Sequence, residues 1–176
     1  MKNLIRNIRY DWPLHFILLF TNWLPDNVIF MKMRGSLIRP FFLKCGKNFK
    51  VGRGNVFYNS QNIEFGDDVY IAFGNWFNAS AKIVVNDQVL FGPKSIIVSS
   101  NHTKMNGSFR FGDSTTAPIN IGFGAWIGGN CAILAGTTIG QGTLIAANTV
   151  VKGNVPNDCL YAGNPGTIKK RIDNPV

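Results

Sequence analysis

The sequence predicts an all-β fold, a parallel β-helix built from six-residue repeats, with a short helical segment in front of it. Three observations lead to this prediction. A large aliphatic residue stands at every sixth position over residues 121–151, a small or β-branched residue follows each one four positions later, and 19 glycines are available for turns. A period of six matches neither the helical period of about 3.6 nor the alternation of an exposed strand.

The repeat is regular enough to place individual side chains. The aliphatic set is Ile121, Ile127, Ile133, Ile139, Ile145 and Val151. The small or β-branched set is Ala125, Cys131, Thr137, Thr143, Thr149 and Val155. An earlier block carries the same period with one two-residue slip: Phe65, Ile71, Phe77, Val85, Phe91 and Ile97. We expect both sets to point inward, three repeats to form one triangular coil, and residues 51–160 to supply roughly five coils of about eighteen residues.

The segment before the repeats differs in composition and charge. Residues 1–53 hold ten Lys and Arg against two Asp, a balance of +8, and the remaining residues hold eight against seven acidic ones, or +1. Asp11 followed by Pro13 predicts a helix start, and a second helix is expected over Val28–Leu37. We therefore divide the chain into a basic helical cap, residues 1–46, and a β-helix domain, residues 47–176.

Composition excludes several classes of protein. No zinc-finger, helix-turn-helix or RNA-recognition pattern accompanies the basic segment, so we expect no nucleic-acid partner. The three cysteines form neither a disulfide framework nor a zinc motif. The apolar run at 12–25 has 14 residues, fewer than the about 20 that a membrane span needs, and no signal-peptide cleavage site follows it. We expect a cytoplasmic location, with the basic segment in peripheral contact with the inner membrane face.

The repeat is interrupted once, by a polar excursion over residues 99–118 that carries a histidine. The chain has two histidines. His15 lies in the apolar N-terminal helix, where we expect a packed or interfacial side chain. His102 stands where the chain leaves a coil, and functional residues are often found on loops that a rigid scaffold holds. We therefore expect His102 to be functional.

Residues 121–172 closely resemble the hexapeptide-repeat acyltransferases, in particular the sugar O-acetyltransferase branch. The motifs that carry the resemblance are "WIG" (126–128), "GTTIG" (136–140), "ANTVV" (147–151) and "AGNPG" (162–166). The resemblance, which covers about residues 46–172, implies a left-handed β-helix. It also implies a homotrimer with acetyl-CoA bound between neighbouring subunits, and acetyl transfer to a hydroxyl of a sugar in a bacterial-type surface polysaccharide or its precursor.

The resemblance also implies roles for particular residues. His102 corresponds to the family's catalytic base, and imidazole suits the removal of a proton from an alcohol at neutral pH. The N–H of Gly129 would stabilise the oxyanion, although the residue is equally explained as a turn glycine. Trp126 would wall the site or lie at the trimer interface. The remaining candidates for CoA binding are Ala147, Lys152, Lys169, Lys170 and Arg171, of which the basic residues are also explained as solvated surface charges.

The acceptor side departs from the family pattern. Galactoside-type enzymes carry an acceptor-binding asparagine in an early coil, and ungapped counting from His102 reaches Ala72 instead. Asn75 and Asn78 are the nearby candidates. Either Asp113 or a backbone carbonyl is expected to orient His102. Cys131 occupies an inward small position, so we do not expect it to act as a nucleophile.

Two other functions compete with sugar O-acetylation. N-acetylation of an amino sugar on a nucleotide sugar would use the same base and the same CoA groove. A structural β-helix scaffold would have unbroken coils without a lone histidine, and the excursion argues against it. A zinc carbonic anhydrase needs three histidine ligands, and the repeat domain has one. We therefore expect no metal.

Overall fold

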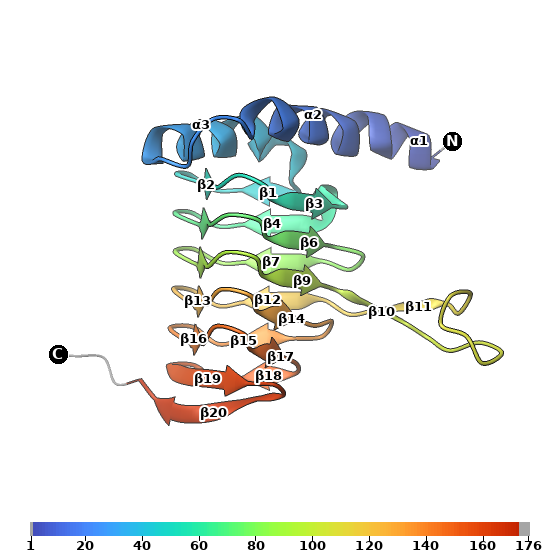
Figure 1. Ribbon diagram of the computed structural model, residues 1–176, viewed down its shortest axis with the longest axis vertical. Coiled ribbons are helices and arrows are strands. Elements are labelled where there is room, and N and C mark those ends of the chain that lie inside the picture. Colours follow the sequence, from blue (N-terminus) through green and yellow to red (C-terminus); the bar gives the residue numbers. More distant parts are fainter. Residues whose placement is uncertain (1, 173–176) are drawn as a thin grey trace.

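The computed structural model describes residues 2–172, with side chains from residue 4 onward. Three sheets, parallel except for the last strand β20, wind into a β-helix, and the N-terminal helices lie across its first coil (Figure 1). Sheet A consists of β1 (Lys44–Cys45), β4 (Ile63–Phe65), β7 (Ile83–Val85), β12 (Ile119–Ile121), β15 (Thr138–Ile139) and β18 (Asn154–Val155). Sheet B consists of β2 (Lys50–Val51), β5 (Tyr70–Ile71), β8 (Leu90–Phe91), β13 (Trp126–Ile127), β16 (Leu144–Ile145), β19 (Cys159–Gly163) and β20 (Gly166–Arg171). Sheet C consists of β3 (Val56–Tyr58), β6 (Trp76–Asn78), β9 (Ile96–Val98), β14 (Ala132–Ile133) and β17 (Val150–Val151).

The inward positions of the six-residue repeat are confirmed. Every aliphatic or aromatic residue of the two predicted sets is at most 1% exposed, and the small or β-branched set is at most 3% exposed. These side chains form one continuous core that runs the length of the β-helix. Each coil covers the inward side chains of the next, so the apolar surface of every coil is buried by its neighbours.

The coils differ in length from the prediction. Glu64 pairs with Val84 twenty positions later, whereas Asn120 pairs with Thr138 eighteen positions later. The early coils hold two more residues at the corner between sheets C and A, where buried Ala79 lies, and this explains the slip in the early repeat. The β-helix also begins earlier than predicted, at β1, and completes five coils and part of a sixth.

The N-terminal segment is one bent helical rod followed by a second helix. It comprises α1 (Lys2–Arg6), the π-helical turn η1 (Asn7–Asp11), α2 (Trp12–Thr21), α3 (Val28–Ile38) and the short 3-10 turn η2 (Arg39–Phe41), and a further 3-10 turn, η3 (Ser60–Asn62), lies within the coils. The predicted helix start at Asp11 is wrong, because Asp11 has helical dihedral angles and makes no cap. Pro13 lacks an N–H to bond back into the preceding turn, and η1 accommodates this loss without ending the helix. The second helix is confirmed, with Asn27 as its N-cap.

A buried arginine fastens the helical cap to the first coil. The Arg34 side chain is fully buried, and its Nη1 donates to the carbonyl of Val51 at 2.6 Å and pairs with Asp26 at 3.2 Å. Its Nη2 donates to the carbonyls of Thr21 and Leu24. One guanidinium therefore joins the end of α2, the loop after it and strand β2. A guanidinium suits this role because it offers five donors in one plane.

The excursion at 99–118 forms a β-hairpin that projects away from the stack (Figure 1). Its strands are β10 (Ser100–His102) and β11 (Ser114–Thr116), which pair antiparallel. Thr103 extends the pairing by donating its N–H to the carbonyl of Asp113 at 2.9 Å. Across residues 2–172, no helix has the length and apolar composition needed to span a bilayer.

Replacing Arg34 with Met should lower the free energy of unfolding by about 3 kcal/mol, because three backbone carbonyls and the partly exposed Asp26 carboxylate lose the donor that the buried guanidinium supplies. The midpoint and slope of urea unfolding measure this loss. Arg53→Met is the matched control, since its Nε lies 3.7 Å from the same Asp26 but its side chain is 44% exposed. That exposed pair should contribute less than about 1 kcal/mol. Equal losses in the two variants would contradict the role of Arg34.

Candidate active site

His102 lies at the end of β10, on the hairpin that projects from the corner between sheets C and A, called here the C/A corner. Its side chain is exposed, and it faces Ser114 in the register of the hairpin. Within residues 4–172, the structure shows no hydrogen bond to its ring. Asp113 accepts from Thr103 through its backbone carbonyl. Orientation of the His102 ring by Asp113 or by a backbone carbonyl therefore stays a prediction from the sequence.

The other candidate residues divide between two corners. Asn78 ends β6 and Lys152 follows β17, so both lie with His102 at the C/A corner. Gly129 and Ala147 lie in the stacked turns that join sheets B and C, called here the B/C corner. These are different edges of the triangular β-helix, so one chain does not bring the base and the proposed oxyanion donor together.

In the part of the chain that the structure describes, the B/C corner has backbone N–H groups without a hydrogen-bond partner, whereas several equivalent groups at the corner between sheets A and B are hydrogen-bonded within the chain. At the corner between sheets A and B, turn N–H groups are bonded by side chains of the next coil, as where Lys47 donates to Asp67 and Gln141 donates to Asn157. Within the described residues, the N–H groups of Gly129 and Ala147 have no such partner. The turns also pack closely, because a Cβ on Gly128 would lie 2.6 Å from the Ala147 nitrogen. The turns of this corner therefore pack closely on one another and, across residues 4–172, leave the N–H groups of Gly129 and Ala147 without hydrogen-bond partners.

The remaining donor-side candidates lie on or beside sheet B. Trp126 points outward from β13 and is 51% exposed. Lys169 and Lys170 are exposed on β20, which pairs antiparallel with β19 at the last coil. Lys169 Nζ donates to the Thr167 hydroxyl. These side chains are accessible from solvent in the single chain.

A polar cavity of about 370 Å³ lies between the N-terminal helices and sheet C. It is lined by Arg6, Asp11, Tyr58, Asn59, Trp76, Asn78 and Ser80. The rings of Tyr58 and Trp76 meet edge to face at 5.7 Å and form one wall. Arg6 and Asp11 lie 3.7 Å apart, and the Arg6 Nε and the Asp11 Oδ1 are buried without a hydrogen-bond partner in the described part of the chain. The cavity therefore combines an aromatic wall with polar lining residues, among them Asn59, Asn78 and Ser80.

This cavity lies at the root of the hairpin that carries His102. Ser99, three residues before His102, donates its N–H to the carbonyl of Asn78 at 3.1 Å. Asn78 Oδ1 accepts from Ser80. Sequence reasoning found Asn78 but missed Arg6, Asp11, Tyr58 and Trp76. The available signal was that Tyr58 and Trp76 adjoin inward phenylalanines, and neighbouring residues of a strand point to opposite faces.

Asn75, the other predicted acceptor residue, lies inside the β-helix. It is fully buried, its side-chain amide donates to the carbonyl of Ala72, and its Oδ1 accepts from the Ser95 N–H. Asn55 and Ser95 occupy the equivalent place in the neighbouring coils and continue this ladder. Its side-chain amide is already hydrogen-bonded to backbone groups of the coil turns, and we therefore leave Asn75 out of the site.

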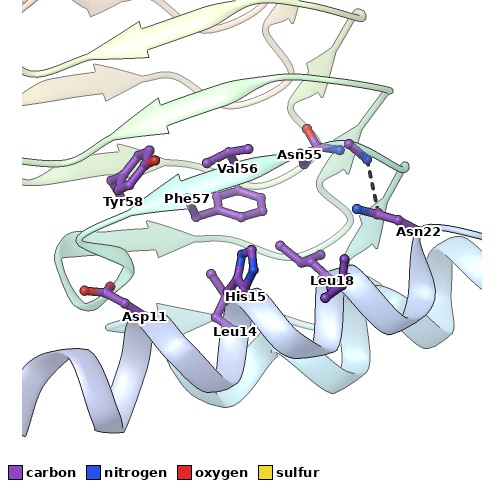
Figure 2. A pocket seen from close by; sticks show the side chains of 11 residues that line it. Asp11, Leu14, His15, Leu18, Asn22, Asn55, Val56, Phe57 and Tyr58 are labelled. Carbon is purple, nitrogen blue, oxygen red and sulfur yellow. Dashed lines mark hydrogen bonds between the residues drawn. The ribbon is translucent and has the colours of Figure 1, made fainter.

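Two further residues lie apart from the candidate site. Cys131 is buried, and burial raises the pKa of its thiol, which agrees with a packing role. His15 lies on α2 beside an apolar groove of about 210 Å³ between that helix and β3. Figure 2 shows Leu14 and Leu18 of α2 facing Phe57 across this groove.

Comparisons with known proteins agree with this architecture. The family described as "Bacterial transferase hexapeptide (six repeats)" matches residues 118–153. The chain is 31% identical over 135 residues to the Escherichia coli K12 protein provisionally named lipopolysaccharide biosynthesis O-acetyl transferase WbbJ. That alignment covers 69% of this chain and 63% of WbbJ, so the chain spans less than two thirds of this relative. It is 30% identical to a Saccharomyces cerevisiae protein provisionally named acetyltransferase YJL218W, over 79% of this chain and 71% of that protein.

A solved structure of galactoside acetyltransferase in complex with coenzyme A superposes with a TM-score of 0.81 at 26% identity. The match covers 92% of this chain and 80% of that one, and the shared fold is the left-handed β-helix. The repeat, the fold and the relatives agree, and the chain belongs to the hexapeptide-repeat acyltransferase family.

Proposed function

We propose that this protein transfers the acetyl group of acetyl-CoA to a hydroxyl of a sugar in a bacterial-type surface polysaccharide or its precursor. The observation that carries the proposal is the polar cavity at Asn78, which lies at the root of the hairpin bearing His102. The similarity to WbbJ supports a surface glycan as the acceptor.

The cavity has the composition expected of a sugar site. Sugars present apolar C–H faces together with hydroxyls, so their sites combine an aromatic wall with a few polar groups. Tyr58 and Trp76 supply the wall. Asn59, Asn78 and Ser80, which also line the cavity, supply hydrogen-bonding groups for hydroxyls. An acceptor held there would lie close to the hairpin, and its reacting hydroxyl would be directed toward His102.

The chemistry is a direct transfer. The hydroxyl oxygen attacks the thioester carbonyl as His102 removes its proton, so the new C–O bond forms without an acyl-enzyme. The C–S bond then breaks, and His102 returns the proton to the departing thiolate. The Gly129 N–H, which has no partner within the described residues, would stabilise the oxyanion that develops on the carbonyl.

The donor is expected to follow the B/C corner. Open N–H groups at Gly129 and Ala147 suit the amides of a pantetheine arm, and Trp126 lies on the adjoining face. The candidates for the CoA phosphates remain Lys152, Lys169, Lys170 and Arg171. The galactoside acetyltransferase that this chain resembles has been solved with coenzyme A bound, which supports the same donor here.

Because the base and the donor corner lie on different edges of one chain, we infer that the complete site forms between copies in a homotrimer. The outward rows of the sheets support this assembly. Sheet A presents mostly polar residues: Lys44, Glu64, Val84, Asn120, Thr138 and Asn154. Sheets B and C expose apolar ones: Val56, Leu90, Ile96 and Trp126. Exposed apolar rows of this kind are typical of subunit contacts.

Removing the base should abolish most of the turnover. In a thiol-release assay with acetyl-CoA and a panel of sugars, nucleotide sugars and glycans, His102→Ala should lower kcat by about 10²–10⁴-fold. His15→Ala, the change at the chain's other histidine, is the control and should keep near-native activity. Turnover with amino sugars alone would move the assignment to N-acetylation, and an unchanged rate in His102→Ala would refute the mechanism.

The acceptor cavity can be tested separately from the donor. Asn78→Ala should raise the KM for the acceptor by about tenfold, since one hydrogen bond to the sugar is lost. The KM for acetyl-CoA should not change. Asn120→Ala, at an exposed asparagine on the outer face of sheet A, serves as the control for both constants. A rise in the KM for acetyl-CoA alone would place Asn78 on the donor side.

Mixed oligomers test whether two copies share a site. His102→Ala removes the base, and Ala147→Trp is designed to fill the donor corner, so each variant alone should be inactive. After unfolding and refolding together in equal amounts, about a quarter of the sites should combine an intact base with an intact donor corner from different chains. Recovery of roughly that fraction of native activity is expected. No recovery from a mixture that forms trimers would mean that each site uses a single chain.

A further inference from the structure

The N-terminal helices expose an unusual amount of apolar side chain. Ten large apolar residues between positions 4 and 29 are more than half exposed: Leu4, Ile5, Ile8, Trp12, Phe16, Leu19, Phe20, Trp23, Val28 and Ile29. Trp23 reaches 77%. Large apolar side chains exposed in this number on one part of a folded protein indicate an interaction site.

Helix α2 shows how this surface arises, because it is apolar on both sides. Its buried residues are Leu14, Leu18 and Thr21, which pack on the first coil. Its exposed apolar residues away from the first coil are Trp12, Phe16 and Phe20, whereas Leu19, although 53% exposed, lines the groove against β3. At about 100° of rotation per residue, these two sets lie on opposite faces of the helix. The first coil uses one face, and the other points away from the β-helix.

The composition of the exposed face fits the boundary between lipid headgroups and acyl chains. Trp12 and Trp23 stand near the two ends of α2, and Phe16 and Phe20 stack between them with ring centroids 6.5 Å apart. Tryptophan is favoured at membrane interfaces, where its ring is buried and its N–H stays wet. Since the helix is too short to span a bilayer, this face suits a helix that lies in the interface.

Charge makes the same end of the molecule attractive to anionic lipids. The exposed cations of the cap and the first coil are Arg9, Lys32, Arg39, Lys44 and Lys47. The two acidic residues of the first 53 positions are already paired: Asp11 with Arg6, and Asp26 with Arg34 and Arg53. The net charge around the apolar face is therefore positive, and basic residues beside such a face strengthen binding to anionic membranes.

We propose that the exposed face of α1, η1 and α2 lies in the surface of an anionic membrane, with the β-helix standing away from it. Both tryptophans and the phenylalanine pair enter the interface, and the surrounding lysines and arginines contact anionic headgroups. This proposal does not depend on the acetyl-transfer activity, and its test uses no enzymatic readout.

The test is flotation of the full-length protein with vesicles. Vesicles of phosphatidylcholine with about a third phosphatidylglycerol should bind at least tenfold more protein than vesicles of phosphatidylcholine alone. The double variant Phe16→Gln/Phe20→Gln should lose at least tenfold of this binding, because two large apolar side chains no longer enter the interface. Ile168→Gln removes a side chain of similar exposure (53%) at the opposite end of the β-helix, and it should bind as the native protein does.

A second measurement distinguishes a loss of membrane binding from misfolding of the Phe16→Gln/Phe20→Gln variant. Brominated phosphatidylglycerol vesicles should quench tryptophan fluorescence of the native protein, and Trp12→Phe/Trp23→Phe should remove most of that quenching while Trp76 and Trp126 remain. Equal binding to neutral and anionic vesicles, no binding, or quenching that persists in the double Trp variant would overturn the proposal. So would a smaller oligomer in Phe16→Gln/Phe20→Gln without vesicle binding, because a second copy would then cover this face.

Discussion

A coil of this β-helix has no hydrophobic core of its own, because its inward side chains are covered only by the coils on either side. The rest of the structure follows from that constraint. Inward positions such as Ile127 and Ile145 pair in exact register and are fully buried, and polar groups that enter the column must find partners in the next coil, as Asn75 and Ser95 do. The stack also needs a cover at each end, which explains why a buried Arg34 ties the helical cap to the first coil.

The same constraint decides where chemistry can be placed. A continuous column of buried side chains leaves the sheets rigid, so variation is confined to outward side chains, corners and insertions. The hairpin with His102 is such an insertion, made at one corner without disturbing the register of the coils above and below it. The open N–H groups of Gly129 and Ala147 lie at another corner. Under the proposed mechanism the site is completed where two copies meet, and catalysis would then be coupled to assembly.

The helical cap has three roles. It covers the first coil through Leu14 and Leu18, it contributes Arg6 and Asp11 to the polar cavity, and its opposite face exposes apolar side chains. Exposed lysines and arginines lie on the same end of the molecule. If that face lies on a membrane, the cavity opens beside the lipid surface, and a sugar carried by a lipid would reach it directly. The membrane proposal and the acceptor proposal are therefore compatible, although neither requires the other.

The six-residue repeat, the inward residues of the coils from Phe65 to Val155, the second helix and the break that carries His102 could all be predicted from the sequence, because a period and an interruption in it are local patterns. The continuous helix through Asp11 could not be predicted in this way, because Pro13 indicates a helix start in the sequence whereas the structure accommodates it with a π-helical turn. Nor did the sequence reveal the cavity: Arg6, Asp11, Tyr58 and Trp76 are far apart in the chain and meet only after the cap folds onto sheet C. Asn75 and Asn78 looked alike in sequence. The three-residue step between them carries the chain from a turn to the end of a strand, so one amide is buried and the other lines the cavity.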